Sequence, residues 1–289
     1  MPSNDDVFLF ASFREPNGLD GLHLAYSRDG YRWTDLGGSF ITPGVGVENL
    51  MRDPCICRGF DGTFHLVWTT GWSERGFGHA SSRDLLNWSD QQYLQVMSHE
   101  PTCLNVWAPK LRFDPARHEY MIYWSSTIPR RYPGDELHPQ HRNHRLYYVL
   151  TRDFVSFTKP VVFFDPGYSV IDAIILESPD RAFALIFKDE RIDRRQLRVA
   201  YGSTPLGPFG NITDPITPAY TEGPTALRLG DRWLVYFDSY RAGCYGAVES
   251  TDLVQWTDAS WKIQCPPGQK HGTIFTAPAS LVEHLVEQL

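Results

Sequence analysis

The chain has 289 residues, of which 42% are hydrophobic and 21% charged, a composition that excludes a mostly disordered protein. Its formal net charge of −7 argues against nucleic acid as the main partner, because phosphate binding requires a basic surface. No apolar run approaches the length of a membrane span, and the N-terminus lacks the basic and apolar regions of a secretion signal. We therefore expect a cytoplasmic protein without a membrane partner, or a secreted one if a signal has been cleaved from it.

Short segments rich in aromatic and β-branched residues recur along the chain and predict β-strands. Four of them end in the same kind of turn, a Ser or Thr followed two residues later by Asp and then by an aromatic residue. In chain order these turns carry Asp29, Asp84, Asp153 and Asp252, and a degenerate fifth copy spans residues 202–209. We interpret the four Asp residues as structural, because Asp in such turns accepts hydrogen bonds from its own backbone.

The turns repeat about every 50–70 residues, which leaves room for four short strands in each repeat. Four-stranded units around an axis form a β-propeller, and five copies predict an all-β, five-bladed propeller that occupies residues 1–289 as one domain. The first 50 residues provide three strands of a blade but no innermost strand. We expect residues 271–275 to supply it, so that pairing of the N- and C-terminal segments closes the ring. Residues 279–289 are predicted to form a short helix.

Three acidic residues occur at one spacing in three of these repeats. Asp53, Asp172 and Glu222 each lie eleven residues before an aromatic residue that opens the next predicted strand. Because equivalent residues of a repeat take equivalent places around the axis, we expect the three carboxyl groups to converge at the hub. Trp107 and His271 take the corresponding places in the other two blades.

The second strand of an antiparallel blade ends on the face where the innermost strand begins, so the second-strand ends should wall a pocket above the acids. These ends lie near residues 13–14, 71–72, 125–127, 188–190 and 238–241. The candidate substrate-binding residues at these ends and at the hub are Trp72, Trp107, Lys188, Tyr240, Arg241 and His271. For the two tryptophans and for His271, simple packing in the core is an equal alternative.

Five short motifs follow one another at the predicted starts of the innermost strands. They are Arg52-Asp53-Pro54, Trp107-Ala108-Pro109, Ile171-Asp172, Glu222-Gly223-Pro224 and His271-Gly272. In this order, and over nearly the whole chain, they resemble glycoside hydrolase family 43, five-bladed propeller enzymes that remove arabinofuranose or xylose units from plant polysaccharides. One difference is that three strands here precede the blade that begins with Asp53, whereas many members begin with that blade.

The resemblance implies a role for each acid: Asp53 corresponds to the general base, Asp172 to the pKa modulator and Glu222 to the general acid. Arg241 resembles an arginine that members bring in after the acid-bearing blade. His271 resembles an axial histidine that contacts a central metal ion or a water cluster in many members. The resemblance requires no cofactor, and a calcium ion at the hub, with His271 as a candidate metal ligand, stays open.

Members of the family invert the anomeric configuration, which requires two carboxyl groups on opposite sides of the sugar. The resemblance therefore predicts roughly 6.5–9.5 Å between the carboxyl groups of Asp53 and Glu222, with room for the attacking water. Among oligosaccharide or glycoside substrates, we expect a terminal α-L-arabinofuranoside first, a β-D-xyloside second and a galactoside third. A pocket walled by large residues favours the removal of terminal units.

Other functions on the same scaffold are weaker predictions. The fructan-cleaving hydrolases carry Arg-Asp-Pro on their middle acid, whereas here this motif holds the first acid, Asp53. The mannoside phosphorylases need a basic cluster for phosphate, for which the sequence offers only Lys188 and Arg241. A sugar-binding propeller without catalysis would not require three converging carboxyl groups. The oligomeric state is open, and the His- and Arg-rich insertion at residues 128–145 could line the pocket or contact a neighbouring subunit.

Overall fold

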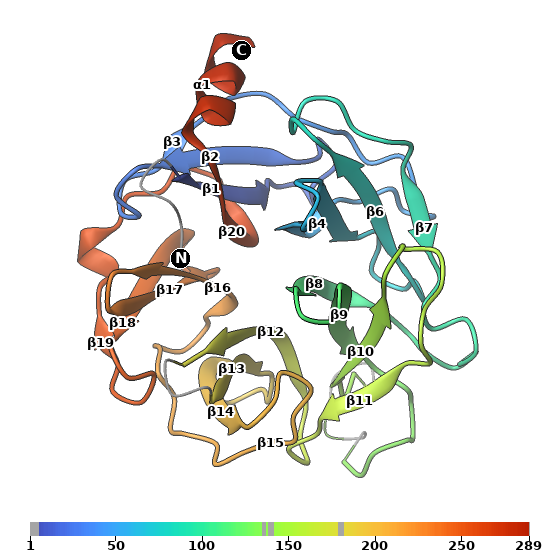
Figure 1. Cartoon of the computed structure of the whole chain (residues 1–289). Coiled ribbons are helices and arrows are strands. Elements are labelled where there is room, and N and C mark those ends of the chain that lie inside the picture. Colours follow the sequence, from blue (N-terminus) through green and yellow to red (C-terminus); the bar gives the residue numbers. More distant parts are fainter. Residues whose placement is uncertain (1–5, 135–136, 138–141, 179–181, 289) are drawn as a thin grey trace.

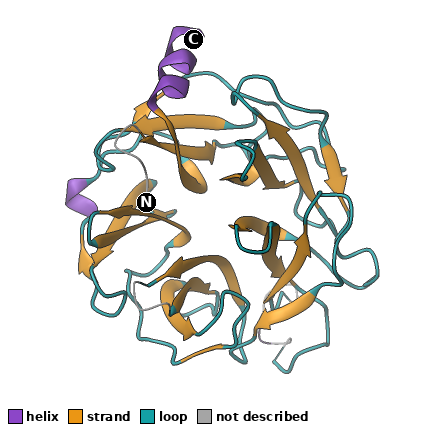
Figure 2. Ribbon diagram, viewed as in Figure 1, coloured by secondary structure: helices purple, strands orange, loops and turns teal. Residues whose placement is uncertain are grey.

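The computed structural model describes residues 6–134, 137, 142–178 and 182–288. Its strands form five antiparallel sheets of four strands each, arranged as blades around a central axis (Figures 1 and 2). The prediction of an all-β, five-bladed propeller with four-stranded blades is confirmed. No helix in the described part of the chain is both long and apolar enough to cross a membrane.

Each blade runs from an innermost strand at the axis to an outermost strand at the rim (Figure 1). The innermost strands are β20 (Lys270–Pro278), β4 (Arg52–Arg58), β8 (Trp107–Asp114), β12 (Val170–Glu177) and β16 (Glu222–Leu229). The second strands are β1 (Asp6–Phe13), β5 (Phe64–Thr69), β9 (Glu119–Ser126), β13 (Phe183–Asp189) and β17 (Arg232–Ser239). The third strands are β2 (His23–Ser27), β6 (Phe77–Ser82), β10 (Arg145–Thr151), β14 (Gln196–Gly202) and β18 (Cys244–Ser250). The outermost strands are β3 (Thr34–Asp35), β7 (Gln92–Leu94), β11 (Val161–Phe164), β15 (Phe209–Gly210) and β19 (Thr257–Asp258), and a short 3-10 helix, η3 (Ser260–Lys262), follows the last of them.

Both ends of the chain build one blade, because β20 pairs antiparallel with β1 in the order β20-β1-β2-β3. Phe10 of β1 lies opposite Ile274 of β20 in this pairing. The predicted closure of the ring by its terminal segments is therefore confirmed. The predicted terminal helix is α1 (Ala279–Gln288), which follows β20 directly at the rim of this blade (Figure 1).

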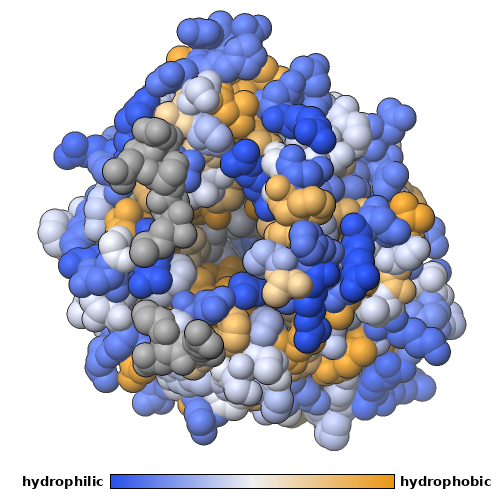
Figure 3. All heavy atoms as spheres, in the orientation of Figure 1, coloured by the Kyte–Doolittle hydropathy of each residue, from blue (hydrophilic) through white to orange (hydrophobic). Residues whose placement is uncertain are grey.

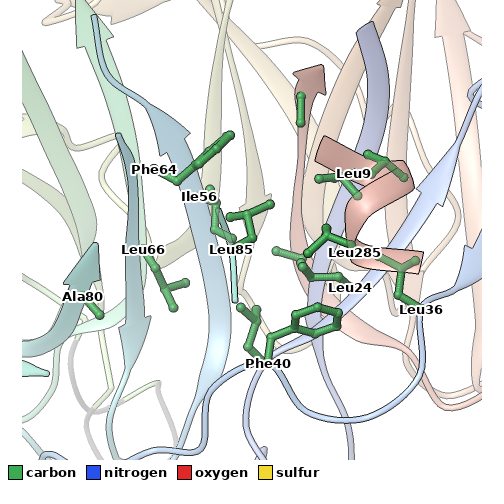
Figure 4. Close-up of a cluster of buried hydrophobic side chains, with 14 of the residues drawn as sticks. Leu9, Leu24, Leu36, Phe40, Ile56, Phe64, Leu66, Ala80, Leu85 and Leu285 are labelled. Atoms are coloured by element: carbon green, nitrogen blue, oxygen red, sulfur yellow. The ribbon is translucent and has the colours of Figure 1, made fainter. Parts of the chain in front are cut away.

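The hydrophobic core lies between neighbouring blades rather than inside any one of them. In one cluster, Leu9 of β1 and Leu24 of β2 lie with Ile56 and Phe64 of the next blade, and Leu285 of α1 joins them (Figure 4). Second strands are apolar on both faces because each lies between two blades. Each fully buried side chain of this kind contributes ~1.5–3 kcal/mol, so packing between blades fixes the positions of the hub residues.

The repeated turns are held by their own side chains, as predicted. In the turn after β6, Asp84 accepts backbone hydrogen bonds from Leu86 and Asn87, and Ser82 accepts one from Leu85. Leu85 has a positive φ of 61° and is fully buried, so the turn also delivers an apolar side chain to the core. The turns of Asp29, Asp153 and Asp252 repeat these bonds.

Candidate active site

A cavity of about 270 Å³ lies at the hub, on the face where the innermost strands begin. Figure 3 shows a hollow near the middle of the ring. The innermost strands of all five blades reach the cavity, and three residues at or beyond the ends of second strands, with one tryptophan, complete it. The lining residues are Arg52, Asp53, Thr69, Trp72, Trp107, Ile171, Asp172, Lys188, Glu190, Glu222 and His271.

The innermost strands carry a bulge where they enter the cavity. At this bulge a residue in the left-handed region (Asp53, Ala108, Asp172 or Gly223, with φ of 49° to 60°) interrupts the strand register. A bulge turns its side chain away from the regular alternation of the strand. Asp53 and Asp172 occupy this position, so both carboxyl groups are turned to the hub, whereas Glu222 comes one residue earlier.

The equal spacing of the three acids therefore hides an offset of one residue. Asp53 lies five residues before Arg58, which pairs with Phe64, whereas Glu222 lies six residues before Arg228, which pairs with Trp233. The strand is one residue longer in the Glu222 blade and its turn one residue shorter, so the total of eleven is kept. The prediction that all three acids share one register is wrong for Glu222, although the three share one cavity.

Asp53 is held as a buried carboxylate. Its residue is 8% exposed, with Oδ1 3.1 Å from His271 Nδ1, and Oδ2 accepts a hydrogen bond of 2.8 Å from Thr69 Oγ1. Burial by itself would raise the pKa of Asp53, but the charge and hydrogen bond of His271, the charge of Arg52 and the bond from Thr69 lower it below the ordinary value. This carboxylate is ionised and can accept a proton.

Asp172 lies near the same nitrogen of His271, but its pKa is shifted in the opposite direction. Its Oδ2 is 4.0 Å from His271 Nδ1 and accepts a hydrogen bond of 3.2 Å from the Gly223 N–H. Burial raises the pKa of Asp172 to about 6. The charges of His271 and Lys188 oppose the rise, and the negative charges of Glu222 and Asp53 add to it. Asp172 thus holds the backbone of the residue that follows Glu222.

Glu222 lies at the more open side of the cavity, with 26% of its side chain exposed. Its Oε2 accepts a hydrogen bond of 2.8 Å from Lys188 Nζ, which also lies 2.7 Å from Glu190 Oε2. Burial by itself would lower the pKa of Lys188, but Glu222, Glu190 and Asp172 raise it above the ordinary value. Lys188 is therefore a charged, buried bridge between two carboxyl groups.

Asp238 is a further buried acid beside Glu222. The two residues are opposite each other in the pairing of β16 with β17, and Asp238 is 2% exposed. Burial raises the pKa of Asp238 to about 6, with Lys270, whose Nζ lies 3.5 Å away, opposing the rise and Glu222 adding to it. Sequence reasoning placed Asp238 in the predicted pocket wall, as part of the strand end 238–241, but gave it no individual role.

Trp72 and Trp107 form one wall of the cavity. Their rings meet edge to face, with centroids 5.6 Å apart, and Trp107 Nε1 donates a hydrogen bond of 3.2 Å to the Trp72 carbonyl. The guanidinium of Arg52 lies 4.5 Å from the Trp72 ring, and that of Arg142 lies 4.4 Å from the Trp107 ring. Trp72 is 38% exposed, so part of it is accessible to a ligand.

The structure places the other predicted binding residues at different depths. Lys188 and His271 line the cavity. Tyr240 lies behind Lys188, whose Nζ is 5.1 Å from the ring centroid, and Arg241 is exposed with its guanidinium 3.4 Å from the Tyr220 ring. Neither Tyr240 nor Arg241 is among the described residues that line the cavity.

The insertion at residues 128–145 reaches the site through Arg142 and His144, which both pack on the Trp107 ring. Residues 135–136 and 138–141 of this insertion lie outside the described residues. The described part of the insertion thus packs against the wall of the cavity at Trp107.

Sequence reasoning gave no role to Arg52, Thr69 and Ile171, which also line the cavity, whereas it placed Glu190, at the second-strand end 188–190, in the pocket wall, and Glu190 does line the cavity. Thr69 and Arg52 are opposite each other in the pairing of β4 with β5, and Lys188 and Ile171 are likewise opposite in the pairing of β12 with β13. The signal that could have found them is this pairing, because a residue opposite the start of an innermost strand faces the hub.

A metal ion at the hub was tested against the residues present. Within the described ranges, no group of three or more His, Cys, Asp or Glu side chains is arranged to hold a metal ion. The Nδ1 atom of His271 is directed at Asp53, and the His271 ring packs against Gly223. The Nε2 atom of His271 is buried without a hydrogen-bond partner, but a calcium ion takes six to eight oxygen ligands, and the described residues offer no such group around it.

Gly223 is required where it packs on His271. It has a φ of 60°, and a Cβ added to it would lie 2.5 Å from His271 Cγ. We expect Gly223→Ala to lower the free energy of unfolding by more than the ~1–3 kcal/mol of left-handed strain, because the His271 ring must also move. Gly230→Ala is the matched control, since Gly230 also has a φ of 60° but open space around it. Equal losses in urea unfolding of the two variants would contradict the expected clash.

The raised pKa of Asp172 makes a prediction about stability and pH. Its ordinary pKa is 3.8, so between about pH 4 and pH 6 the folded state keeps a proton that the unfolded state loses, and stability falls as pH rises. Asp172→Asn is always neutral and still accepts the Gly223 bond. At 1.36 kcal/mol per pKa unit, we expect it to be more stable than the wild type at pH 7 by at most about 3 kcal/mol. Thermal unfolding should show the two proteins converging near pH 4, and a constant difference at all pH values would refute this assignment.

Comparison with known proteins places this geometry in a family. The family described as a probable glycosyl hydrolase domain, related to glycoside hydrolase family 43, matches residues 5–280. An α-L-arabinofuranosidase of Bifidobacterium longum subsp. longum is 27% identical in an alignment of 151 residues, and the match covers 43% of this chain but only 14% of that protein.

Solved structures show the same fold at low identity. The α-L-arabinofuranosidase from Lactobacillus brevis matches with a TM-score of 0.57 and 16% identity, over 73% of this chain and 72% of its own. An exo-β-1,3-galactanase from Phanerochaete chrysosporium, solved with galactose, matches with a TM-score of 0.54 and 13% identity, over 72% of this chain and 49% of its own. Because the family match covers nearly the whole sequence, the chain belongs to the family of probable glycosyl hydrolase domains related to glycoside hydrolase family 43.

Proposed function

We propose that this protein is an inverting glycoside hydrolase that releases terminal α-L-arabinofuranose from oligosaccharides. The observation that carries the proposal is that two acids of one cavity have pKa values shifted in opposite directions. Asp53 is buried with a lowered pKa, whereas Asp172 beside it has a pKa raised to about 6. Titratable groups whose environments push their pKa values apart are typical of acid and base catalysis.

In the proposed reaction, Asp53 is the general base. Its carboxylate takes a proton from a water molecule while the water oxygen attacks the anomeric carbon of the sugar. The hydrogen bonds of Asp53 to His271 and Thr69 keep the carboxylate oriented during this transfer. The bond from the anomeric carbon to the leaving oxygen breaks, and the configuration is inverted.

Glu222 is the general acid that protonates the leaving oxygen. Lys188 binds Oε2 of Glu222, so the proton to be transferred is carried on Oε1. Asp172 fixes the start of β16 through the Gly223 N–H and acts on Glu222 by charge. The separation of roughly 6.5–9.5 Å between the carboxyl groups of Asp53 and Glu222 follows from this mechanism.

The size of the cavity supports removal of terminal units. At about 270 Å³ it lies just below the range of ~300–1,000 Å³ that is usual for drug-sized ligands. Such a volume suits one sugar ring, and Trp72 and Trp107 offer flat apolar surfaces on which a ring can stack. The α-L-arabinofuranosidases among the similar proteins support arabinofuranose as the sugar.

A terminal β-galactoside is the second candidate substrate, because a galactanase solved with galactose shares the fold. A β-D-xyloside stands beside it, as the family resemblance implies. Phosphorolysis is less well supported, because Lys188 is bound between two carboxyl groups and Arg241 is stacked on Tyr220. In the described site, Lys188 and Arg241 therefore do not form a basic cluster that could bind phosphate.

The proposal is tested by incubating the protein with nitrophenyl α-L-arabinofuranoside, β-D-xyloside and β-D-galactoside, each with and without inorganic phosphate. We expect hydrolysis of the arabinofuranoside, independent of phosphate, and proton NMR should show the inverted anomer as the first product. A first product with retained configuration contradicts the mechanism. Sugar binding without release of nitrophenol from any glycoside contradicts the enzymatic function itself.

A further inference from the structure

The hub contains one more charged side chain, directly behind the acids. Lys110 of β8 is 2% exposed, and its Nζ donates hydrogen bonds of 3.1 Å to the Gly272 carbonyl and 2.9 Å to Thr273 Oγ1. Both acceptors belong to β20, which is separated from β8 by β4 in the ring (Figure 1). The Lys110 side chain therefore reaches across the axis of the propeller.

A buried lysine in this position destabilises the fold unless its ammonium group has partners. Lysine is almost never fully buried without a partner, because the interior disfavours the ammonium group. Among the described residues, no carboxylate lies within 4.0 Å of Lys110 Nζ, so its direct partners are neutral oxygens. A backbone carbonyl and a hydroxyl are the kind of oxygen that a bound cation also uses.

Asp53 and Asp172 of the site and the buried thiol of Cys55 also act on this ammonium, although none of them is a direct partner. Burial lowers the pKa of Lys110, whereas Cys55, Asp53 and Asp172 raise it. These groups come from β4 and β12, and β20 presents His271 together with the two bonded oxygens. Lys110 is thus a second buried ammonium beside the cluster of acids, in addition to Lys188.

Lys110 is also linked mechanically to the acids. Its two acceptors follow His271 directly in the chain, and His271 contacts both Asp53 and Asp172. The backbone at Gly272 is itself tightly placed, since a Cβ there would lie 1.8 Å from the Ala11 carbonyl oxygen. Fixing this segment fixes the ring that orients the base.

We propose that Lys110 is a built-in cation of the hub, which holds the backbone after His271 and balances the charge of Asp53 and Asp172, so that the site works without a divalent metal ion. Lys110 is on this view a positioning residue and not a catalytic one. The part that concerns catalysis rests on the proposed glycosidase function, whereas the part that concerns cation binding and stability does not.

The test compares Lys110→Met, which keeps the length of the side chain without its charge, with Lys159→Met, the same change at an exposed position. We expect Lys110→Met to have a lower Tm and a kcat/KM reduced ~10–100-fold, the usual loss for residues that orient reacting groups. The acidic limb of its kcat/KM profile should move to higher pH, because Asp53 loses a nearby positive charge. Lys159→Met should match the wild type in all three measurements.

A second arm uses the wild-type protein alone. Its Tm and activity should be unchanged by EDTA and by millimolar Ca²⁺. A loss of Tm in EDTA that Ca²⁺ restores would overturn the proposal, as would a Lys110→Met protein with the Tm and the pH profile of the wild type.

If Lys110→Met does not fold, Thr273→Val removes one acceptor and keeps the ammonium. It should lower the Tm and shift the acidic limb in the same direction by a smaller amount, and an unchanged Tm and limb would overturn the proposal. If no glycoside is cleaved by the wild type, the proposed glycosidase function fails, but the Tm measurements still decide the role of Lys110.

Discussion

Asp53→Asn is expected to reduce kcat by ~10²–10⁴-fold on every cleavable glycoside, because it removes the proposed general base. The reduction should not depend on the leaving group, since deprotonation of the attacking water is needed whatever group departs. Asparagine has the shape of aspartate and can still accept the bond from Thr69 Oγ1, so the Tm should show a folded protein. The measurement is kcat on a nitrophenyl glycoside and on a natural oligosaccharide.

The control for this variant is Asp193→Asn, in which the same chemical change is made on a side chain that is 73% exposed. It should keep the activity of the wild type. An Asp53→Asn protein that is folded and retains more than half of the activity would exclude Asp53 as the base. A loss confined to poor leaving groups would indicate that Asp53 and Glu222 have exchanged roles.

Glu222→Gln is expected to reduce kcat by ~10²–10⁴-fold on oligosaccharides, whose leaving oxygen needs a proton, but far less on nitrophenyl glycosides. A nitrophenolate departs without protonation, so the proposed acid has little to contribute there. Glutamine can keep the bond from Lys188 Nζ at 2.8 Å through its carbonyl oxygen, which preserves the geometry of the wall. The measurement is the ratio of the losses on the two kinds of substrate.

The matched control is Glu283→Gln on α1, which lies at the rim of its blade, and the glutamate side chain there is 63% exposed. Its kcat should equal that of the wild type on both substrates. Equal losses of Glu222→Gln on the oligosaccharide and the nitrophenyl glycoside would remove Glu222 from the acid role. A loss that depends on the leaving group in the Glu222 variant but not in the Asp53 variant is therefore the clearest signature of the proposed pair.

Much of the fold could be predicted because it repeats. The four turns at Asp29, Asp84, Asp153 and Asp252 are held by hydrogen bonds between each Asp side chain and the backbone a few residues later. Such local bonds can be predicted from the residue types and their spacing. Five such units are expected to form a ring, because each blade can bury its two faces only against other blades. The pairing of β20 with β1 followed from the missing innermost strand at the N-terminus.

The sequence predicted which acids belong to the candidate site better than it predicted where each side chain lies. Repetition placed Asp53, Asp172 and Glu222 at the hub, but the count of eleven residues concealed that Glu222 precedes its bulge. Tyr240 and Arg241 were expected at the pocket from a strand end, yet they lie behind and outside its lining. A strand end predicts a face of the ring, whereas the distance of a side chain from the axis depends on turns and neighbours.

The sequence by itself determined the number of blades, the closure of the ring and the identity of the acids at its centre, because each of these depends on short-range patterns that recur. Only the tertiary structure decided which acid is paired with His271, which with Lys188, and that Lys110 crosses the axis to β20. These contacts join residues from different blades, 34 to 218 positions apart in the chain. The pKa values that distinguish the proposed base, Asp53, from the proposed modulator, Asp172, depend on burial and on charges from neighbouring blades. The sequence of a single repeat does not contain these neighbours.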